Sequence, residues 1–156
     1  MILSKLFLQD FRCYENLELD FDSKFNSIIG LNGQGKTSIL EAIHTLGNLK
    51  SFRDALNSEL IKIGCSNAVV KAKFQNEDLT FNLTAKIQPN RKQALFNGKP
   101  CKYLNEYIGK VASVSFCPND LQIFHLGPER RRGWIDRLAK ALYPDHIELC
   151  SKYNRS

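Results

Sequence analysis

Residues 30–37 have the side-chain types and the spacing that a phosphate-binding loop requires. They spell G-x-x-x-x-G-K-T, and the residues are Gly30, Leu31, Asn32, Gly33, Gln34, Gly35, Lys36 and Thr37. Glycines let consecutive backbone N–H groups converge on one anion. Lys36 would supply a positive charge to the β- and γ-phosphates, and the hydroxyl of Thr37 would ligate Mg²⁺. The pattern predicts a nucleotide-binding loop; the alternative is a glycine turn that opens an ordinary helix.

The residues on both sides of this loop suit a strand–loop–helix arrangement. Residues 25–29 are short and apolar, with β-branched residues, which predicts a buried strand in a parallel or mixed sheet. After the loop, the residues at helical spacing are Ile39, Leu40, Ile43 and Leu46. We therefore expect an amphipathic helix that starts where the loop ends. Its N-terminus would add the positive end of the helix dipole to the phosphate site.

Alternating apolar and polar residues predict antiparallel strands before and after the loop. Residues 2–9 and 17–22 read as two paired strands upstream of it. Residues 68–74 and 79–87 alternate in the same way, and the dipeptide Asn97-Gly98 favours the positive φ angles of a two-residue hairpin turn. The middle of the chain is thus a predicted antiparallel meander, unlike the βαβ order of a Rossmann protein. The expected fold class is α/β, with a mixed sheet around the loop helix and the meander beside it.

The formal net charge of the 156-residue chain is +6, which favours polyanionic partners. Basic residues gather in the meander, where Glu106 is the single acidic residue between positions 86 and 110. The predicted contacts to a DNA backbone are Lys86, Arg91, Lys92, Lys99 and Lys102. A solvated hairpin without a ligand is the alternative interpretation of this charge.

Arginines outside the meander are candidates for contacts with a nucleotide or a partner. Arg12 lies between the two upstream strands and is interpreted either as a second phosphate contact or as an ordinary surface residue. Residues 127–143 predict a helix that starts at Gly127-Pro128. Its arginines are Arg130, Arg131 and Arg132. At about 100° per residue they cannot share one helix face, so we expect at least one to be available to a ligand or partner.

The composition is that of an ordinary globular protein. Hydrophobic residues make up 43% and charged residues 24%, and the longest apolar runs are too short to span a membrane. The five cysteines are scattered and form no CxxC pair. That pattern indicates reduced thiols in a cytoplasmic protein, not a disulfide frame or a zinc site.

Several stretches together resemble the RecF family of bacterial DNA replication and repair ATPases, which is related to SMC proteins. The stretches are LQDFRCYENLELDF, GLNGQGKTSILEAIHTLGNLKSFR, ELIKIG and FCPNDLQIFHLGPERRRGWID, in the family's order and spacing. The loop with SFR and the GPERRRGWID stretch are the most specific parts, whereas the loop alone would also fit ABC transporters. The resemblance covers nearly the whole chain.

The resemblance implies the N-terminal part of an ABC-type, SMC-like ATPase head, in which ATP and Mg²⁺ lie between the two heads of a dimer. Residues 30–37 would take the Walker A role, Arg12 would neighbour the nucleotide phosphates, and Arg53 in SFR would be a further contact. Family members act at single-strand gaps and gap junctions in DNA, where they help RecO and RecR to load RecA. The expected parts of the chain are a loop-bearing core at about 1–66, the meander at about 67–116 and a helical end at 118–156 that leads toward an arm.

The sequence departs from the family pattern at several points. Cys13 stands where asparagine is usual, Asn119 replaces an acidic residue, and Val114 lies near a position where related heads carry a metal-contacting glutamine. After the loop there is no apolar strand ending in Asp-Asp or Asp-Glu and no signature motif. We therefore assign no catalytic residue and expect a truncated head that binds nucleotide weakly at most and does not turn it over measurably.

Two other classes of function stay open at this point. One is a small P-loop switch or kinase, which would need its own metal-binding aspartate and substrate elements; the sequence shows neither. The other is a non-catalytic fragment that binds DNA or a partner protein.

Overall fold

The computed structural model describes residues 1–76, 79–102, 107–108, 110–111 and 113–117, together with residues 127–128, 132–133, 135 and 139. The chain divides into two compact units, Met1–Ser113 and Val114–Ser156. In the second unit, the described residues with helical backbone are Pro128, Arg132, Gly133, Ile135 and Ala139, all within the helix predicted at 127–143. Most of that predicted helix lies outside the described residues.

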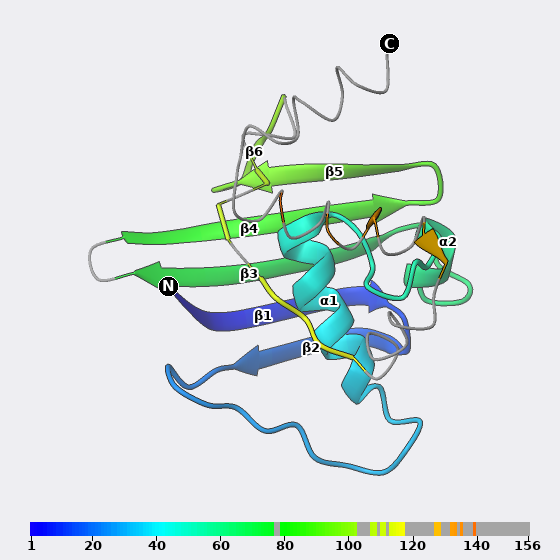
Figure 1. The fold of residues 1–156 in the computed structure, drawn as a ribbon, viewed down its shortest axis with the longest axis horizontal. Helices are drawn as coiled ribbons and strands as arrows, with labels where there is room; N and C mark the ends of the chain where they lie inside the picture. Colours follow the sequence, from blue (N-terminus) through cyan, green and yellow to red (C-terminus); the bar gives the residue numbers. More distant parts are fainter. Residues whose placement is uncertain are drawn as a thin grey trace. The chain divides into compact units, whose positions relative to one another are not determined.

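A six-stranded antiparallel sheet forms the body of the first unit (Figure 1). Its strands are β1 (Ile2–Phe11), β2 (Tyr14–Asp20), β3 (Ala68–Asn76), β4 (Leu79–Gln88), β5 (Arg91–Phe96) and β6 (Lys99–Pro100), in the spatial order β2-β1-β3-β4-β5-β6. The two strands predicted upstream of the loop and the meander predicted after it are confirmed, and the β1–β3 pairing joins them. Asn97 and Gly98 have φ angles of 49° and 80°, as the predicted hairpin turn requires.

The helix α1 (Lys36–Asn48) crosses one face of this sheet in front of β1, β3 and β4 (Figure 1). Alternate residues of a strand point to the same face, so the strands present a continuous apolar surface to the helix. The buried core at this surface consists of Ile39, Ala42 and Leu46 with Leu6, Leu8, Val70, Ala72, Leu83, Ala85 and Ile87. The short helix α2 (Asn57–Leu60) follows α1 and adds the buried Leu60 to the same core.

The prediction of a mixed sheet around the loop is wrong for the described residues, whose strands form an antiparallel sheet. Residues 25–29 form no strand and belong to an open loop that bows away from the sheet between β2 and α1 (Figure 1). Phe25 is 80% exposed and Ile29 is 89% exposed. A strand is stable when a neighbour satisfies its backbone N–H and C=O groups. None of the named strands pairs with residues 25–29, which have no strand structure.

The apolar stripe predicted on α1 is correct for Ile39 and Leu46 but wrong for Leu40, which is 53% exposed. Glu41 and Thr45 take buried positions instead, each with 0% exposure. The buried side of the helix therefore includes two polar residues. No helix among the residues described above is long and apolar enough to cross a membrane.

Candidate nucleotide-binding site

The predicted phosphate loop runs directly into α1. Gly33 and Gly35 have φ angles of 82° and 87°, a region that residues with a Cβ atom rarely adopt. The carbonyl oxygen of Gly35 accepts the first hydrogen bonds of the helix, from the N–H groups of Ser38 at 2.8 Å and Ile39 at 3.2 Å. The other N–H groups at a helix N-terminus lack partners inside the helix and suit an anion.

The ammonium group of Lys36 lies over the loop that precedes it. Its Nζ donates hydrogen bonds to the carbonyl oxygens of Gly30 at 2.7 Å and Leu31 at 2.6 Å. The side-chain oxygen of Gln34 accepts a hydrogen bond from the N–H group of Leu31 at 3.1 Å, which closes the loop. The side chain of Thr37 is exposed on the first turn of α1. This donor set, one ammonium, one hydroxyl and a helix N-terminus, fits a nucleotide phosphate with its Mg²⁺.

The turn between β1 and β2 packs against this loop. A Cβ atom at Gly35 would stand 2.6 Å from Sγ of Cys13 and 2.7 Å from the hydroxyl oxygen of Tyr14. The Tyr14 hydroxyl donates a hydrogen bond to the carbonyl oxygen of Gln34 at 3.2 Å. Glycine is therefore required at position 35 for two reasons, its φ angle and the space that the turn takes up. Cys13, one of the departures from the family pattern, lies at this contact.

Arg12, in the same turn, donates its hydrogen bonds to α1 and α2. Its Nε and Nη2 atoms reach the two carboxylate oxygens of Glu41 at 2.9 and 2.7 Å, and its Nη1 reaches the carbonyl oxygen of Glu59 at 2.7 Å. This bidentate geometry is the strong form of an ion pair. The guanidinium thus lies near the phosphate loop but is held by Glu41, and its predicted contact with a nucleotide stays a prediction.

Glu41 is the residue of this site that the sequence analysis missed. The hydroxyl of Ser51 donates to its carboxylate at 2.5 Å, and the N–H group of Arg53 donates to Oγ of Ser51 at 2.9 Å. Burial alone would raise the pKa of Glu41. The hydrogen bonds from Arg12 and Ser51 and the charges of Arg12 and Arg53 outweigh burial and hold the pKa of that carboxyl below its ordinary value. Glu41 is therefore a carboxylate that ties α1 to two distant parts of the chain.

The other predicted arginine contacts are only partly described. The side chain of Arg53 is exposed, beside the Ser51–Glu41 pair. Arg132 is exposed in the second unit, whereas Arg130 and Arg131 lie outside the described residues. Of the two departures downstream, Val114 is 90% exposed, and Asn119 also lies outside the described residues.

The structure divides the basic residues predicted to bind DNA between two faces. Lys86 and Arg91 lie opposite Gln93 and Gln88 on the face away from α1, and both are exposed. Lys92 lies opposite the buried Ile87 and donates to the carbonyl oxygen of Leu49 at 2.9 Å, at the C-terminus of α1. Burial, with the nearby charge of Lys50, lowers the pKa of Lys92.

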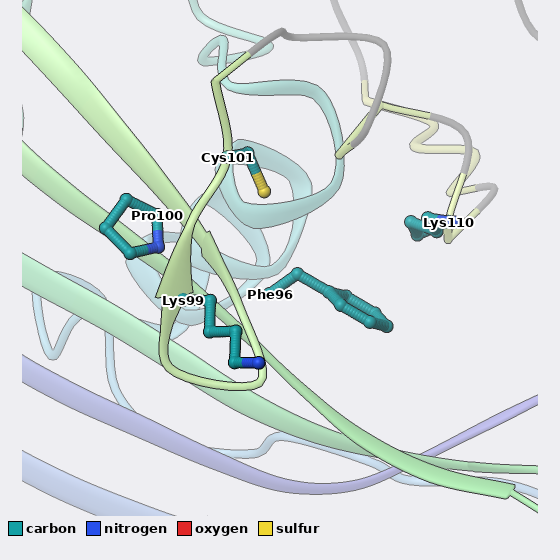
Figure 2. A pocket seen from close by; sticks show the side chains of 5 residues that line it. All are labelled: Phe96, Lys99, Pro100, Cys101 and Lys110. Carbon is teal, nitrogen blue, oxygen red and sulfur yellow. The ribbon is translucent and has the colours of Figure 1, made fainter.

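Lys99 stands apart from both groups, on the β5–β6 hairpin. It lines a pocket of about 290 Å³ together with Phe96, Pro100, Cys101 and Lys110. Figure 2 shows these five side chains. The ammonium of Lys110 lies 5.5 Å from the ring centre of Phe96, a cation–π contact. Lys102, the last member of the predicted set, follows this hairpin and is exposed.

Comparison with known proteins identifies relatives over almost the whole chain. The RecF/RecN/SMC N terminal domain family matches residues 2–121. The DNA replication and repair protein RecF of Leptospira interrogans is 39% identical over 159 aligned residues, covering 99% of this chain and 43% of that protein. The RecF protein of Chlamydia trachomatis is 36% identical, covering 97% of this chain and 42% of its own length. The chain thus spans less than half of the length of these relatives.

A solved structure has the same fold as this chain. The recombination mediator protein RecF-ATP, from the RecFOR pathway, matches with a TM-score of 0.92 and 31% sequence identity. The match covers 99% of this chain and 42% of that one.

Proposed function

Because the chain belongs to the RecF/RecN/SMC N-terminal domain family, we propose that residues 30–37 bind the phosphates of ATP. One observation carries the proposal: the Lys36 ammonium lies across a glycine loop at the N-terminus of α1. The similarity to RecF-ATP over 99% of the chain supports ATP as the nucleotide. ATP would exchange the two carbonyl partners of Lys36 for phosphate oxygens.

Each residue of the site has a distinct task in this proposal. Lys36 would neutralise charge on the β- and γ-phosphates, and the Thr37 hydroxyl would help to hold Mg²⁺, which would offset negative charge on the phosphates. Backbone N–H groups of residues 33–37 surround the phosphates, because the glycines allow them to converge. Glu41 fixes α1 against the sheet, so the loop is presented from a rigid helix.

The chain then acts as the N-terminal part of an ATPase head in DNA repair. In this proposal the remainder of a RecF-like protein supplies the Walker B carboxylates and the signature motif, and two heads close over ATP. The head works at single-strand gaps and gap junctions with RecO and RecR to load RecA. The exposed apolar side chains of Phe25, Ile29 and Leu40 support a missing second layer on the outer side of α1.

Calorimetric titration with MgATP tests the nucleotide site. We expect Lys36→Ala to weaken binding about 10- to 100-fold, because hydrogen bonds to charged groups contribute about 1.5–3 kcal/mol. Alanine is compatible with the start of α1, so the circular dichroism spectrum should be unchanged. Lys24→Ala is the matched control, because Lys24 is an exposed lysine outside the loop. Equal affinities of wild type and Lys36→Ala would refute the site.

A further inference from the structure

The face of the sheet opposite α1, here called the open face, is defined by the strand register. Cross-strand pairs on it include Phe7–Lys71, Lys73–Asn82 and Lys86–Gln93. Its other positions are Ile2, Lys5, Gln9, Asn16, Glu18, Asp20, Val69, Gln75, Thr80, Thr84, Gln88, Arg91, Leu95 and Pro100. A sheet with one side on the core ordinarily carries polar residues on the other. This open face is polar in that sense, but its charges are unevenly placed.

On β3, β4 and β5 the open face carries basic residues and no acidic residue among those described. The basic residues are Lys71, Lys73, Lys86 and Arg91, all exposed. None of them forms an ion pair with another described residue. Lys71 and Lys73 are two residues apart on β3, about 7 Å along the strand. Lys86 lies diagonally across from Lys71 on β4, at a Cα separation of about 7–8 Å.

At the β1–β2 end of the open face, by contrast, acidic neighbours neutralise a lysine. On β1, Lys5 lies between β2 and β3, and its ammonium contacts Glu18 at 2.6 Å and Asp20 at 3.3 Å. Both acidic residues are on β2, at the edge of the sheet. Lys73 is the direct cross-strand partner of Lys5 and has no such partner of its own among the described residues. The cluster on β3, β4 and β5 therefore lacks the acidic neighbours that neutralise Lys5.

From this cluster we infer that the open face binds the phosphate backbone of duplex nucleic acid. Four closely spaced cations without counter-charges are complementary to a polyanion, and phosphate contacts of this kind carry no sequence information. Single-strand binding surfaces add exposed aromatic rings on which bases stack. The only aromatic side chain at the register positions given above is Phe7, which is half-buried. The choice of nucleic acid among polyanions rests on the proposed role in DNA repair.

This surface differs from the one that the sequence predicts. Lys86 and Arg91 belong to both, but Lys92 is occupied at the C-terminus of α1 and Lys99 lies on the β5–β6 hairpin. Lys71 and Lys73 replace them, because the register brings β3 beside β4. Variants in the two sets therefore separate the two surfaces.

The test is the salt dependence of binding to a short fluorescent DNA duplex of mixed sequence, measured by anisotropy with the full chain. The open-face variant is Lys71→Gln, Lys73→Gln and Lys86→Gln combined. The matched control, Lys24→Gln, Lys50→Gln and Lys99→Gln combined, removes the same charge from exposed positions elsewhere. The slope of log K against log salt should fall by up to about 2.7 in the open-face variant, at about 0.9 for each lost phosphate contact. The control slope should match the wild type.

A third variant keeps the charge, with arginine at positions 71, 73 and 86, and should retain the wild-type slope. Circular dichroism and thermal melting establish that each variant is folded. Equal slopes in the open-face and control variants, or tighter binding to a single strand of the same length than to the duplex, would overturn the inference. The ATP site and the proposed repair function would survive that result. If the wild-type chain bound neither the duplex nor the single strand, both the inference and the DNA part of the proposed function would be overturned. The result of the ATP titration would be unaffected.

Discussion

The buried side of α1 and the loop arm, residues 25–35, both belong to the candidate nucleotide site, but they are built differently. On the buried side, Glu41 has no exposed surface and accepts hydrogen bonds from Arg12 and Ser51. In the loop arm, Phe25 and Ile29 are exposed on a segment without strand structure. The same short stretch of chain thus passes from an exposed loop to a helix fixed by a buried ion pair.

This difference shows which half of the site these residues can build alone. The Arg12–Glu41–Ser51 contacts join partners that are all present in the described residues, so the fold can satisfy them. Phe25 and Ile29 of the loop arm are exposed instead. An element forms when its backbone and side-chain groups are satisfied, and it stays open when they are not. The contacts that position α1 are therefore present within the described residues.

The largest expected effect is on the free energy of unfolding, when the buried Arg12–Glu41 ion pair is broken and compared with the exposed Lys5–Glu18 pair. Arg12→Met leaves the buried carboxylate of Glu41 without its main partner and should reduce the free energy of unfolding by about 3–5 kcal/mol. Lys5→Met removes an exposed pair with Glu18 and should change the free energy of unfolding far less. Urea denaturation followed by circular dichroism measures both values. Similar losses in the two variants would show that the Glu41 pair does not hold the helix.

A smaller effect distinguishes two glycines within the loop arm. Gly33→Ala places a Cβ in open space at positive φ and should cost about 1–2 kcal/mol from backbone strain alone. Gly35→Ala has the same strain and also meets Cys13 and Tyr14, so it should cost more, about 2–3 kcal/mol. Thermal melts of both variants compare them. If Gly33→Ala were the more damaging, the contact between the turn and the loop would be wrong.

Local patterns in the sequence were sufficient for the loop and the antiparallel strands. The G-x-x-x-x-G-K-T spacing and the alternation of residues 68–74 depend only on neighbours along the chain, which is why the helix start and the strand were both predicted correctly. The prediction of a strand at residues 25–29 was wrong because a strand also needs a pairing partner, which a local sequence pattern does not reveal. An apolar segment therefore predicts burial only where the rest of the fold provides a surface.

The ion pair of Glu41 could not be predicted from a local sequence pattern either, because its partner is distant along the chain. Its partner Arg12 is 29 residues away, so the ion pair exists only after β1 and α1 have packed. No local signal marked Glu41, because at about 100° per residue it lies about 160° around the helix from Ile39, outside the predicted apolar stripe. Lys92 is a parallel case, since its register opposite Ile87 turns it toward α1 instead of toward a DNA backbone.

The smallest expected effect is a pH dependence of the same buried pair. Because the pKa of Glu41 is lower in the folded state than its ordinary value of 4.5, its stabilisation is fully present above that value. It is lost as the pH falls through the folded pKa. Glu41→Gln lacks this contribution, so the stability difference between wild type and variant should be constant near neutral pH and shrink on acidification. Urea denaturation across this range measures it; a difference that grows toward acid would contradict the ion pair.

A steady-state phosphate-release assay tests most directly the claim that this chain holds half of an ATPase site. Phosphoryl transfer needs a positioned Mg²⁺, an oriented nucleophile and stabilised charge, of which Lys36 and Thr37 supply only part. Each missing group adds to the barrier, and about 1.4 kcal/mol corresponds to a tenfold loss in rate. The purified chain should release phosphate from ATP no faster than Lys36→Ala, which serves as the control for contamination. Turnover clearly above that control would place the catalytic carboxylate within these 156 residues and contradict the account.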